Sequence, residues 1–422
     1  MEAPLTARIQ PDGAPLDRAG YEAAGGYGAL RKVLTDMAPE EVTRLVRDSG
    51  LRGRGGAGFS TGMKWGFVPL DDERPTCIVA NADEMEPGTF KDRILLEGDP
   101  HQMVEAMAVS GYAIQARYAF IFLREEYRPA ARALNRAIRE AYEAGYLGVD
   151  ILGSGYHLDL LLHTSAGRYI CGEETALLSA LEGRRPLPRA KPPYPQQSGL
   201  WGRPTVVNNV ETLCNVPHIV NNGAAWFQGL SRTEDAGTKL YGASGKVNRP
   251  GAWELPMGTT AREVIEEHAG GMRSGVRLKG MLPGGASTPF LTDEHLDMPM
   301  DFTQVGNAGS RLGTAAIIAL DDKTCPVGML ANLEQFFARE SCGWCTPCRD
   351  GLPWTERILR AIDRGAGQQG DLENLALHCH YLGPGRTFCA HAPGAVGPLE
   401  SGLQYFREDF ERHIREQQCP WE

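Results

Sequence analysis

The chain has 422 residues, of which 42% are hydrophobic and 23% charged, a composition typical of folded rather than disordered proteins. At roughly 150 residues per domain, this length predicts about three domains. The formal net charge of −10 disfavours nucleic-acid binding, which requires a basic surface. No apolar run approaches the roughly 18 residues that span a bilayer. The opening residues, MEAPLTARIQPDG, lack the basic and apolar regions of a secretory signal, so we expect neither export nor membrane insertion.

Residues 1–61 are expected to form an N-terminal segment with one helix and a glycine-rich loop. The helix, Pro39–Asp48, has proline in its first turn and is followed by Gly50, as is usual for helix ends. The loop, LRGRGGAGFSTGMKW, has the spacing G-x-G-x-x-G from Gly53 to Gly58. A helix rather than a strand precedes it, so it is not the usual dinucleotide fingerprint. Its small residues still allow backbone N–H groups to approach a phosphate or a flat ring. A flexible surface turn is the alternative.

Residues 62–234 alternate between strand and helix patterns. Short apolar runs predict strands at 76–80, 118–123, 158–163 and 204–208. Helical spacing occurs at 100–114 and 128–144, between the first three strands, and further helices are expected after Gly172 and from Asn209. Strands that alternate with helices predict an α/β fold with a parallel, Rossmann-like sheet covered by helices. A proline-rich loop with basic and aromatic residues, RRPLPRAKPPYPQQSGLWGRP, precedes the fourth strand.

The remainder of the chain predicts two further domains. In residues 235–324, strands near 239–241, 252–255 and 276–281 and a helix at 260–268 indicate a small α+β domain of the ubiquitin-like (β-grasp) type. Residues 325–422 are predicted to form a four-helix bundle, because short loops join the helical patterns. These patterns cover residues 332–338, 352–363, 372–381 and 399–415.

Six of the ten cysteines fall in the last fifth of the chain, which indicates a metal site rather than a disulfide scaffold. Cys342, Cys345 and Cys348 have the spacing C-x2-C-x2-C, which places three thiolates around a cubane [4Fe–4S] cluster, with a fourth ligand from elsewhere. Cys389 lies in a glycine- and proline-rich turn and is the preferred fourth ligand. Cys379 lies within a helical pattern, where a cysteine is usually part of the core. A zinc site and free buried thiols are the alternatives. Nearby His391 is interpreted as structural.

Polar residues follow the predicted strands where the strands end. Because ligands of open parallel sheets bind beyond the carboxyl ends of the strands, we expect a ligand site at this edge, beside the glycine loop. Each polar cluster alone has a structural alternative, since Asp, Asn and Glu also end strands and cap helices. The clusters comprise Asn81, Asp83 and Glu84; Gly172, Glu173 and Glu174; and Asn208, Asn209 and Thr212.

Six motifs together resemble the NADH-binding flavoprotein subunits (the F or 51 kDa type) of bacterial respiratory complex I, the proton-translocating NADH:quinone oxidoreductase. They are LRGRGGAGFSTGMKW, NADEMEPGTFKDR, YICGEETALL, PTVVNNVETL, ESCGWCTPCRDG and TFCAHAPGA. The resemblance covers the chain from about residue 20. The same core occurs in diaphorase subunits of NAD-linked hydrogenases and formate dehydrogenases, which is the alternative interpretation. Those relatives often carry additional cluster-binding segments, and their absence here favours complex I.

The resemblance implies FMN, one [4Fe–4S] cluster and a site for NADH/NAD+. The implied FMN residues are Gly53, Arg54, Gly55, Gly56, Lys64, Asn81, Asp83, Glu84, Gly172, Glu173, Asn208, Asn209 and Thr212. The implied NADH residues are Phe59 near the nicotinamide, Glu86 and Glu174 near polar groups, Lys191, and Phe67 and Tyr194 on either side of the adenine. The implied cluster ligands are Cys342, Cys345, Cys348 and Cys389.

The resemblance also implies the reaction. NADH gives two electrons as a hydride whereas a cubane accepts one electron at a time, and a flavin is able to connect the two. No catalytic acid or base is expected, so Glu84, Glu86 and Glu174 are assigned to binding and electrostatic tuning. Because the site would gather Glu86, Glu173 and Glu174 with few matching cations, we expect NADH to be preferred over NADPH.

The implied partners are the other subunits of the complex I peripheral arm, especially a thioredoxin-like [2Fe–2S] subunit and the large iron–sulfur subunit. No nucleic-acid partner and no direct membrane insertion are expected. The implied location is cytoplasmic, peripheral on the cytoplasmic face of the inner membrane. A structural zinc protein that only scaffolds a complex is the rival of a different class, since zinc would account for the cysteines alone.

Overall fold

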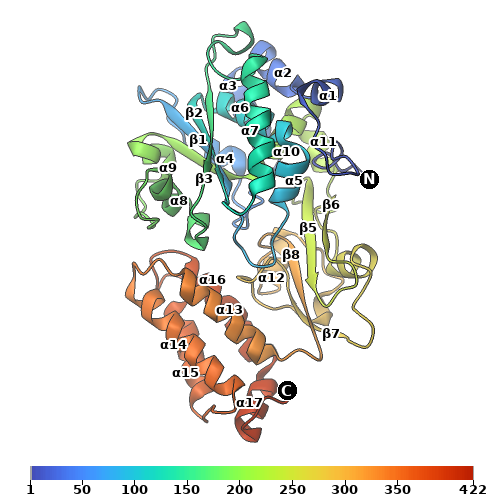
Figure 1. Cartoon of the computed structure of the whole chain (residues 1–422), viewed down its shortest axis with the longest axis vertical. Helices are drawn as coiled ribbons and strands as arrows, with labels where there is room; N and C mark the ends of the chain where they lie inside the picture. The colour runs from blue at the N-terminus through green and yellow to red at the C-terminus, as the bar shows by residue number, and fades with distance from the viewer. Residues whose placement is uncertain (1, 422) are drawn as a thin grey trace. The chain divides into compact units, whose positions relative to one another are not determined.

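The computed structural model describes residues 2–421 and contains two compact units (Figure 1). The first comprises the chain up to Met85, Phe90–Leu240 and Glu254–Gly258. The second comprises Glu86–Thr89, Tyr241–Trp253 and the chain from Thr259. No helix within residues 2–421 is long and apolar enough to cross a membrane. The finer division into four domains stays a prediction.

A four-stranded parallel sheet forms the centre of the first unit, which confirms the predicted α/β class. Its strands are β1 (Thr76–Ala82), β2 (Ala116–Leu123), β3 (Asp159–Thr164) and β4 (Thr205–Asn209), in the order β3-β2-β1-β4. The chain moves outward from β1 through β2 to β3, and then returns to place β4 on the other side of β1. This reversal creates a topological switch point between β1 and β4, and a ligand is expected beyond the carboxyl ends of these two strands.

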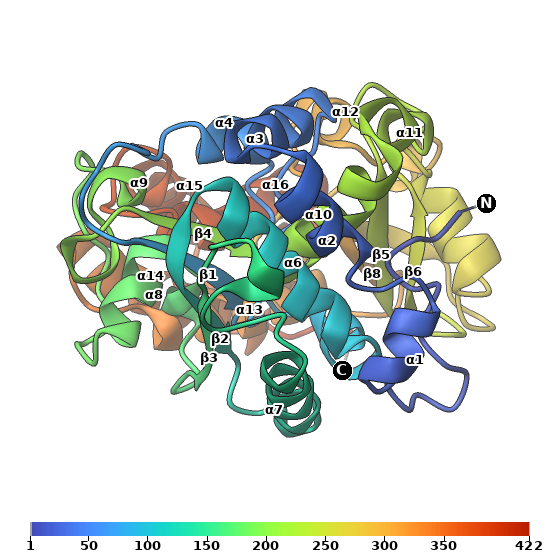
Figure 2. The same cartoon turned by 90° about the horizontal axis from the view of Figure 1, so that it is seen from above.

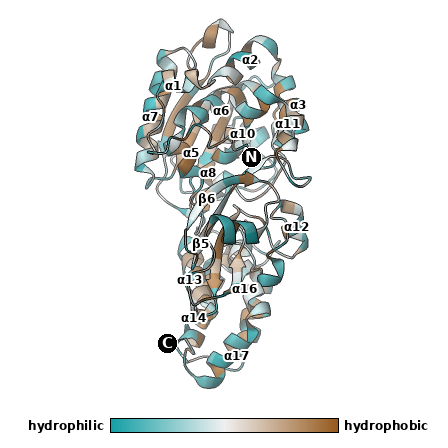
Figure 3. Cartoon of the chain, turned by 90° about the vertical axis from the view of Figure 1, so that its right-hand side faces the viewer, coloured by the Kyte–Doolittle hydropathy of each residue, from teal (hydrophilic) through white to brown (hydrophobic). Residues whose placement is uncertain are grey.

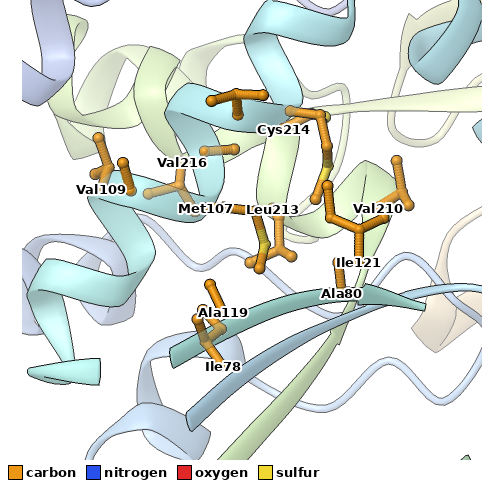
Figure 4. Close-up of a cluster of buried hydrophobic side chains, with 14 of the residues drawn as sticks. Ile78, Ala80, Met107, Val109, Ala119, Ile121, Val210, Leu213, Cys214 and Val216 are labelled. Carbon is orange, nitrogen blue, oxygen red and sulfur yellow. The ribbon is translucent and has the colours of Figure 1, made fainter. Parts of the chain in front are cut away.

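The core of the first unit lies between this sheet and helices α6 (Pro100–Ala113) and α10 (Val210–Asn222). Nearly every residue of α6 is buried, because the sheet, α7 and α10 surround it. Figure 4 shows side chains of both helices and of the sheet meeting in one apolar cluster. Burying each large aliphatic side chain contributes about 1.5–3 kcal/mol to the stability of the fold, so this cluster holds α6 and α10 firmly against the sheet. Its labelled members are Ile78, Ala80, Met107, Val109, Ala119, Ile121, Val210, Leu213, Cys214 and Val216.

The other helices of the first unit surround this core. Helix α3 has the bounds predicted from sequence, Pro39–Asp48, and α7 (Arg128–Glu143) buries an Ala/Leu/Ile face. Helix α2 packs beside α6 and α10, as Figure 2 shows. The remaining bounds are α1 Arg18–Ala23, α2 Gly28–Asp36, α4 Thr61–Trp65, α5 Asp92–Gly98, α8 Glu174–Leu181, α9 Pro195–Ser198 and α11 Ala224–Gly229.

A second four-stranded sheet has the order β6-β5-β8-β7. It comprises β5 (Thr238–Gly245), β6 (Gly251–Pro256), β7 (Leu278–Leu282) and β8 (Ala316–Asp321). Strand β8 pairs in parallel with β5 and antiparallel with β7. The other three strands were predicted from the sequence, and β8 was missed because a six-residue apolar run does not by itself distinguish a strand from a buried helix. The predicted helix at 260–268 is a π-helix, Glu263–His268, and a short helix, α12 (Phe302–Asn307), follows.

The C-terminal region is helical, as predicted. Its helices are α13 (Pro326–Glu340), α14 (Thr346–Asp363), α15 (Asp371–Leu382), α16 (His391–Tyr405) and α17 (Arg407–Glu416). Helices α14, α16 and α17 carry both hydrophilic and hydrophobic residues (Figure 3), as surface helices of a bundle do. Two details of the prediction are wrong. The single helix expected at 399–415 is α16 and α17, separated at Phe406. Helices α13, α14 and α16 also begin earlier, because a proline fits the first turn, where its missing N–H is not needed.

Candidate functional site

A cavity of about 860 Å³ lies in the first unit at the switch point of the parallel sheet. Its volume is in the range of small-molecule and cofactor sites. It brings together the predicted residues Gly53, Gly55, Phe59, Lys64, Phe67, Asn81, Gly172, Glu173, Glu174, Lys191, Tyr194, Asn208, Asn209 and Thr212. The lining also contains residues that were not predicted, namely Ala57, Gly58, Gln196, Gln197 and Val207. Ala57 and Gly58 belong to the predicted glycine loop but were not among the residues assigned to the ligand.

The glycine loop lies against one wall of the cavity with its backbone exposed to it. Its ends are closed by a hydrogen bond from Gly53 N to Phe59 O of 2.8 Å. Gly58 has a φ of +65°, in the left-handed region that favours glycine. A Cβ on Gly55 would lie 2.9 Å from the Cβ of Asn209, so a larger residue would displace the β4 end. The absence of side chains here lets a flat ligand approach the backbone closely.

Arg54 has a different position from its glycine neighbours. Its backbone N–H donates to Thr212 Oγ1 at 2.7 Å, and its guanidinium donates to Ala236 O at 2.6 Å. The side chain is fully buried and does not line the cavity. Arg54 therefore ties the loop to the protein beneath it.

The carboxylate of Glu174 is held between two lysines at the cavity wall. Lys64 Nζ donates to Glu174 Oε2 at 2.7 Å and to Val207 O at 2.8 Å, and Lys191 Nζ donates to Glu174 Oε1 at 2.8 Å. Burial would raise the pKa of Glu174, but the two ammonium groups outweigh it and the pKa is lowered. Lys191 also lies 3.3 Å from Glu173 Oε1. The expectation that these carboxylates have few matching cations is therefore wrong.

Asparagines at the ends of β1 and β4 both line the cavity and hold local structure. Asn81 Nδ2 donates to Gly172 O at 3.3 Å, and Trp65 Nε1 donates to Asn208 Oδ1 at 2.9 Å. Asn209 is the N-cap of α10, and its Nδ2 donates to Asp92 Oδ2 at 2.6 Å. The capping and ligand-site interpretations are therefore compatible, since the same side chains lie at a helix start and at the cavity wall.

Three predicted acidic residues do not line this cavity. Asp83 accepts a hydrogen bond from Ser165 Oγ at 2.8 Å. Glu84 accepts from Tyr127 Oη at 2.8 Å and from two backbone N–H groups at the start of α5, and burial raises its pKa to about 7. Glu86 belongs to the second unit, where it accepts from Ser287 N at 2.6 Å. Gly56 also lies outside the lining residues. The ligand contacts of all four stay predictions.

A buried network of ionic side chains contacts Asn209 through Asp92. Lys91 Nζ lies 2.6 Å from Asp92 Oδ1 and 2.7 Å from Glu211 Oε2, and Lys239 Nζ lies 2.6 Å from the same Glu211 oxygen. Burial would raise the pKa of Glu211, but the two lysines lower it to about 2. Except for the adjacent Lys91 and Asp92, these residues come from separate segments of the sequence, and no spacing rule relates them.

Three aromatic side chains stand partly exposed at the cavity. Phe59, Phe67 and Tyr194 are 50%, 54% and 53% exposed. The rings of Phe59 and Phe67 have centroids 6.5 Å apart and are tilted by 42°. Exposed aromatic faces beside a glycine loop suit a ligand with planar rings.

The cysteines of the two C-terminal motifs meet at the start of α14. Cys345 is the N-cap of α14, Cys348 lies in its first turn, and Cys389 lies just before Ala390, the N-cap of α16. Burial raises the pKa of the Cys348 thiol to about 12, with further contributions from the nearby Cys345, Cys389 and Cys342. Four neighbouring thiols are the donor set of a cubane iron–sulfur cluster.

Cys379 and His391 lie in core positions. Cys379 is buried on α15, and its pKa is raised by burial and by the nearby Glu334 and Glu400. A ring nitrogen of His391, Nε2, lies 2.8 Å from Phe337 O. Both therefore have the core positions that their sequence contexts favoured.

A parallel sheet with a planar-ligand cavity at its switch point and a four-cysteine centre in the same chain define an iron–sulfur flavoprotein of the electron-transfer class. Three family models match the chain: the Nuo51 FMN-binding domain at residues 46–218, the SLBB domain at 243–291, and the NADH-ubiquinone oxidoreductase-F iron-sulfur binding region at 328–413. The chain belongs to the family of the F subunits of NADH-quinone oxidoreductase.

Relatives that carry this name support the assignment over nearly the whole chain. The F subunits of Salmonella typhimurium and Escherichia coli NADH-quinone oxidoreductase are each 58% identical over 414 residues, which is 98% of this chain and 93% of theirs. The Streptomyces coelicolor protein is 50% identical over 95% of this chain and 89% of its own length.

Solved structures with the same fold include an NAD+-reducing [NiFe]-hydrogenase in two states. The air-oxidised form is 34% identical with a TM-score of 0.80, covering 92% of this chain and 66% of that chain. The H2-reduced form is 33% identical with a TM-score of 0.82, covering 97% of this chain and 67% of that chain. This chain thus spans about two thirds of the length of the hydrogenase chain.

Proposed function

We propose that this chain is the electron-input subunit of a proton-translocating NADH:quinone oxidoreductase. It oxidises NADH in the cavity of the first unit and passes single electrons through a [4Fe–4S] cluster to partner subunits. The observation that carries this proposal is the cavity itself, in which a bare glycine loop, exposed aromatic rings and polar strand ends converge at the switch point of a parallel sheet.

The residues at the strand ends fit an FMN. Gly53 and Gly55 present backbone to the cavity, and Asn81, Asn208 and Thr212 present hydrogen-bonding side chains. Lys64 offers a cation for the negative phosphate. Bound there, FMN supplies the ability to accept a hydride and release electrons one at a time. Gly172, Glu173 and Asn209 complete the lining, and the predicted FMN residues outside it, Arg54, Gly56, Asp83 and Glu84, would act from behind it.

The exposed aromatic residues and the Lys191–Glu174 pair fit NADH. Phe67 and Tyr194 would flank the adenine, and Phe59 would lie near the nicotinamide, because an aromatic face suits each planar ring. Lys64 and Lys191 together keep Glu174 ionised at the cavity wall. No side chain has to supply or remove a proton for hydride transfer, so the protein groups act by binding and orientation.

The four-cysteine centre fits a [4Fe–4S] cluster with ligands Cys342, Cys345, Cys348 and Cys389. Thiolates are the only protein donors that a cubane requires. A structural zinc ion is the competing occupant.

The proposed partners follow from the same assignment. They are subunits of a complex I peripheral arm, with a thioredoxin-like [2Fe–2S] subunit and the large iron–sulfur subunit as the nearest candidates. The chain would then be peripheral on the cytoplasmic face of the membrane. The second candidate is a diaphorase subunit of an NAD-linked hydrogenase, which the hydrogenase fold match favours. Copurification with quinone-oxidoreductase subunits or with hydrogenase subunits distinguishes the two.

The test is to purify the chain anaerobically and measure its cofactors and activity. We expect about one FMN and about four iron atoms per chain, together with NADH-dependent reduction of ferricyanide. Failure to bind FMN, or zinc instead of iron in the four-cysteine centre of active preparations, would refute the proposal.

A further inference from the structure

A second group of metal-binding side chains lies in the C-terminal helical region, apart from the four-cysteine centre in sequence. It consists of Cys325, Asp363, His413 and Cys419. One donor atom from each residue lies within 4.8 Å of every other. The four residues come from four places: the N-cap of α13, the last residue of α14, the last turn of α17, and the segment after α17.

Two distances within the group are close to those between neighbouring ligand atoms of a tetrahedral ion. Cys325 Sγ lies 3.3 Å from His413 Nε2 and 3.9 Å from Asp363 Oδ1. Zn–S bonds of about 2.3 Å and Zn–N or Zn–O bonds of about 2.0 Å place neighbouring ligand atoms of a tetrahedron about 3.3–3.8 Å apart. The group therefore needs only small movements to close around such an ion.

The imidazole ring of His413 has the orientation that a metal-bound histidine has, with Nε2 directed toward the group. Its other ring nitrogen, Nδ1, lies 2.7 Å from Asp409 O. A carbonyl oxygen only accepts hydrogen bonds, so Nδ1 carries the proton and Nε2 keeps its lone pair toward Cys325. This arrangement fixes the tautomer and the ring plane of a metal-bound histidine. The ring is fully buried and stacks on Trp421, with centroids 5.7 Å apart.

The sulfur of Cys325 lies at a helix N-terminus and accepts a backbone hydrogen bond. Gly328 N donates to Cys325 Sγ at 3.3 Å, at the N-terminal end of the 15-residue helix α13. An N–H donor and the positive end of the helix dipole both favour a negative sulfur. The fourth residue, Cys419, is buried. Two sulfurs, one imidazole and one carboxylate suit zinc, whereas the harder cations calcium and magnesium prefer ligands that are all oxygen.

We propose that Cys325, Asp363, His413 and Cys419 bind one structural Zn²⁺ ion, which fastens the segment after α17 to helices α13 and α14. All four positions of the tetrahedron are filled by protein, as in structural rather than catalytic zinc sites. Binding releases the two thiol protons to solvent and involves no change of oxidation state. The ion would stabilise the C-terminal region without taking part in electron transfer.

The test uses the full-length, cofactor-loaded protein. We expect about one zinc per chain, and zinc K-edge X-ray absorption should show two sulfur and two nitrogen or oxygen neighbours, with Zn–S of about 2.3 Å. Zinc with four sulfur neighbours would instead be an ion misplaced in the four-cysteine centre and would overturn the proposal. A protein that contains no zinc and melts at the same temperature with or without added zinc would also overturn it.

Two variants assign the ligands. Cys419→Ser should lose the zinc while keeping FMN and iron, and a zinc chelator that lowers the melting temperature of the wild type should no longer do so. The matched control, Cys379→Ser, removes another buried cysteine of the same region and should keep the zinc. If Cys419→Ser fails to fold, His413→Gln takes its place. A disulfide between Cys325 and Cys419 in freshly purified protein, detected as a mass lower by two hydrogens, would refute the site.

Discussion

Replacing Tyr194 by alanine tests the proposed adenine site. The ring is 53% exposed at the cavity, while the backbone of Tyr194 starts α9 through Gln197 N donating to Tyr194 O at 2.9 Å. The substitution keeps that backbone bond, so stability should change by no more than about 0.5 kcal/mol, as for other surface positions. Aromatic stacking on a base contributes about 1–3 kcal/mol, which corresponds to a rise in KM for NADH of roughly 5- to 150-fold. Because the adenine is remote from the reacting carbon, kcat should hardly change.

The assay is steady-state ferricyanide reduction, corrected for bound flavin. Tyr194→Phe keeps the ring face and should resemble the wild type. Trp201→Ala is the matched control, since Trp201 is also about half exposed in the first unit, at 52%, but does not line the cavity. A Tyr194→Ala enzyme with full flavin and an unchanged KM would remove Tyr194 from the site. Loss of flavin together with stability would show that Tyr194 only packs the proline-rich loop.

Three further predictions concern the metal centre, the glycine loop and a buried acid. Cys389→Ser should abolish the EPR signal of the reduced cluster while FMN remains, and Cys379→Ser should keep the signal; the opposite pattern would exchange their roles. Gly55→Ala should weaken FMN binding by about tenfold or more, since its Cβ would displace Asn209, and unchanged flavin affinity by fluorescence titration would contradict the loop's role. Glu334 is buried without a hydrogen-bond partner among residues 2–421, and burial raises its pKa well above 4.5. Its contribution to stability is therefore complete below about pH 4.5 and is lost as the pH rises through the raised pKa. The free energy of unfolding, measured by denaturant titration, should therefore fall less toward alkaline pH in Glu334→Gln than in the wild type. If it changes with pH in the same way in both proteins, Glu334 is not a buried neutral acid.

Much of the fold was predictable because its signals are local. Strands β1 to β4 are short apolar runs, and helix α3 has proline in its first turn and glycine beyond its end. Strand β8 was missed because a six-residue apolar run does not by itself distinguish a strand from a buried helix. The break between α16 and α17 was missed because Phe406 continues the helical pattern of apolar residues.

The site was predictable to the extent that it is built from motifs. The glycine loop, the strand ends and the C-x2-C-x2-C motif are each contiguous, and parallel strands bring their carboxyl ends to one edge. Pairings between distant segments were not predictable. The two lysines that hold Glu174 come from α4 and from the proline-rich loop. The same limit applies to Cys325 and Cys419, which have no local spacing to relate them.

An anaerobic titration of the purified, cofactor-loaded protein with NADH tests the proposed electron entry most directly. It follows the flavin by absorbance and the cluster by EPR in the same samples. We expect NADH to bleach the flavin and a reduced [4Fe–4S] signal then to appear in the wild type, whereas Cys389→Ser should show the bleaching alone. A flavin that stays oxidised in the presence of excess NADH would contradict the assignment of this cavity as the site where electrons enter.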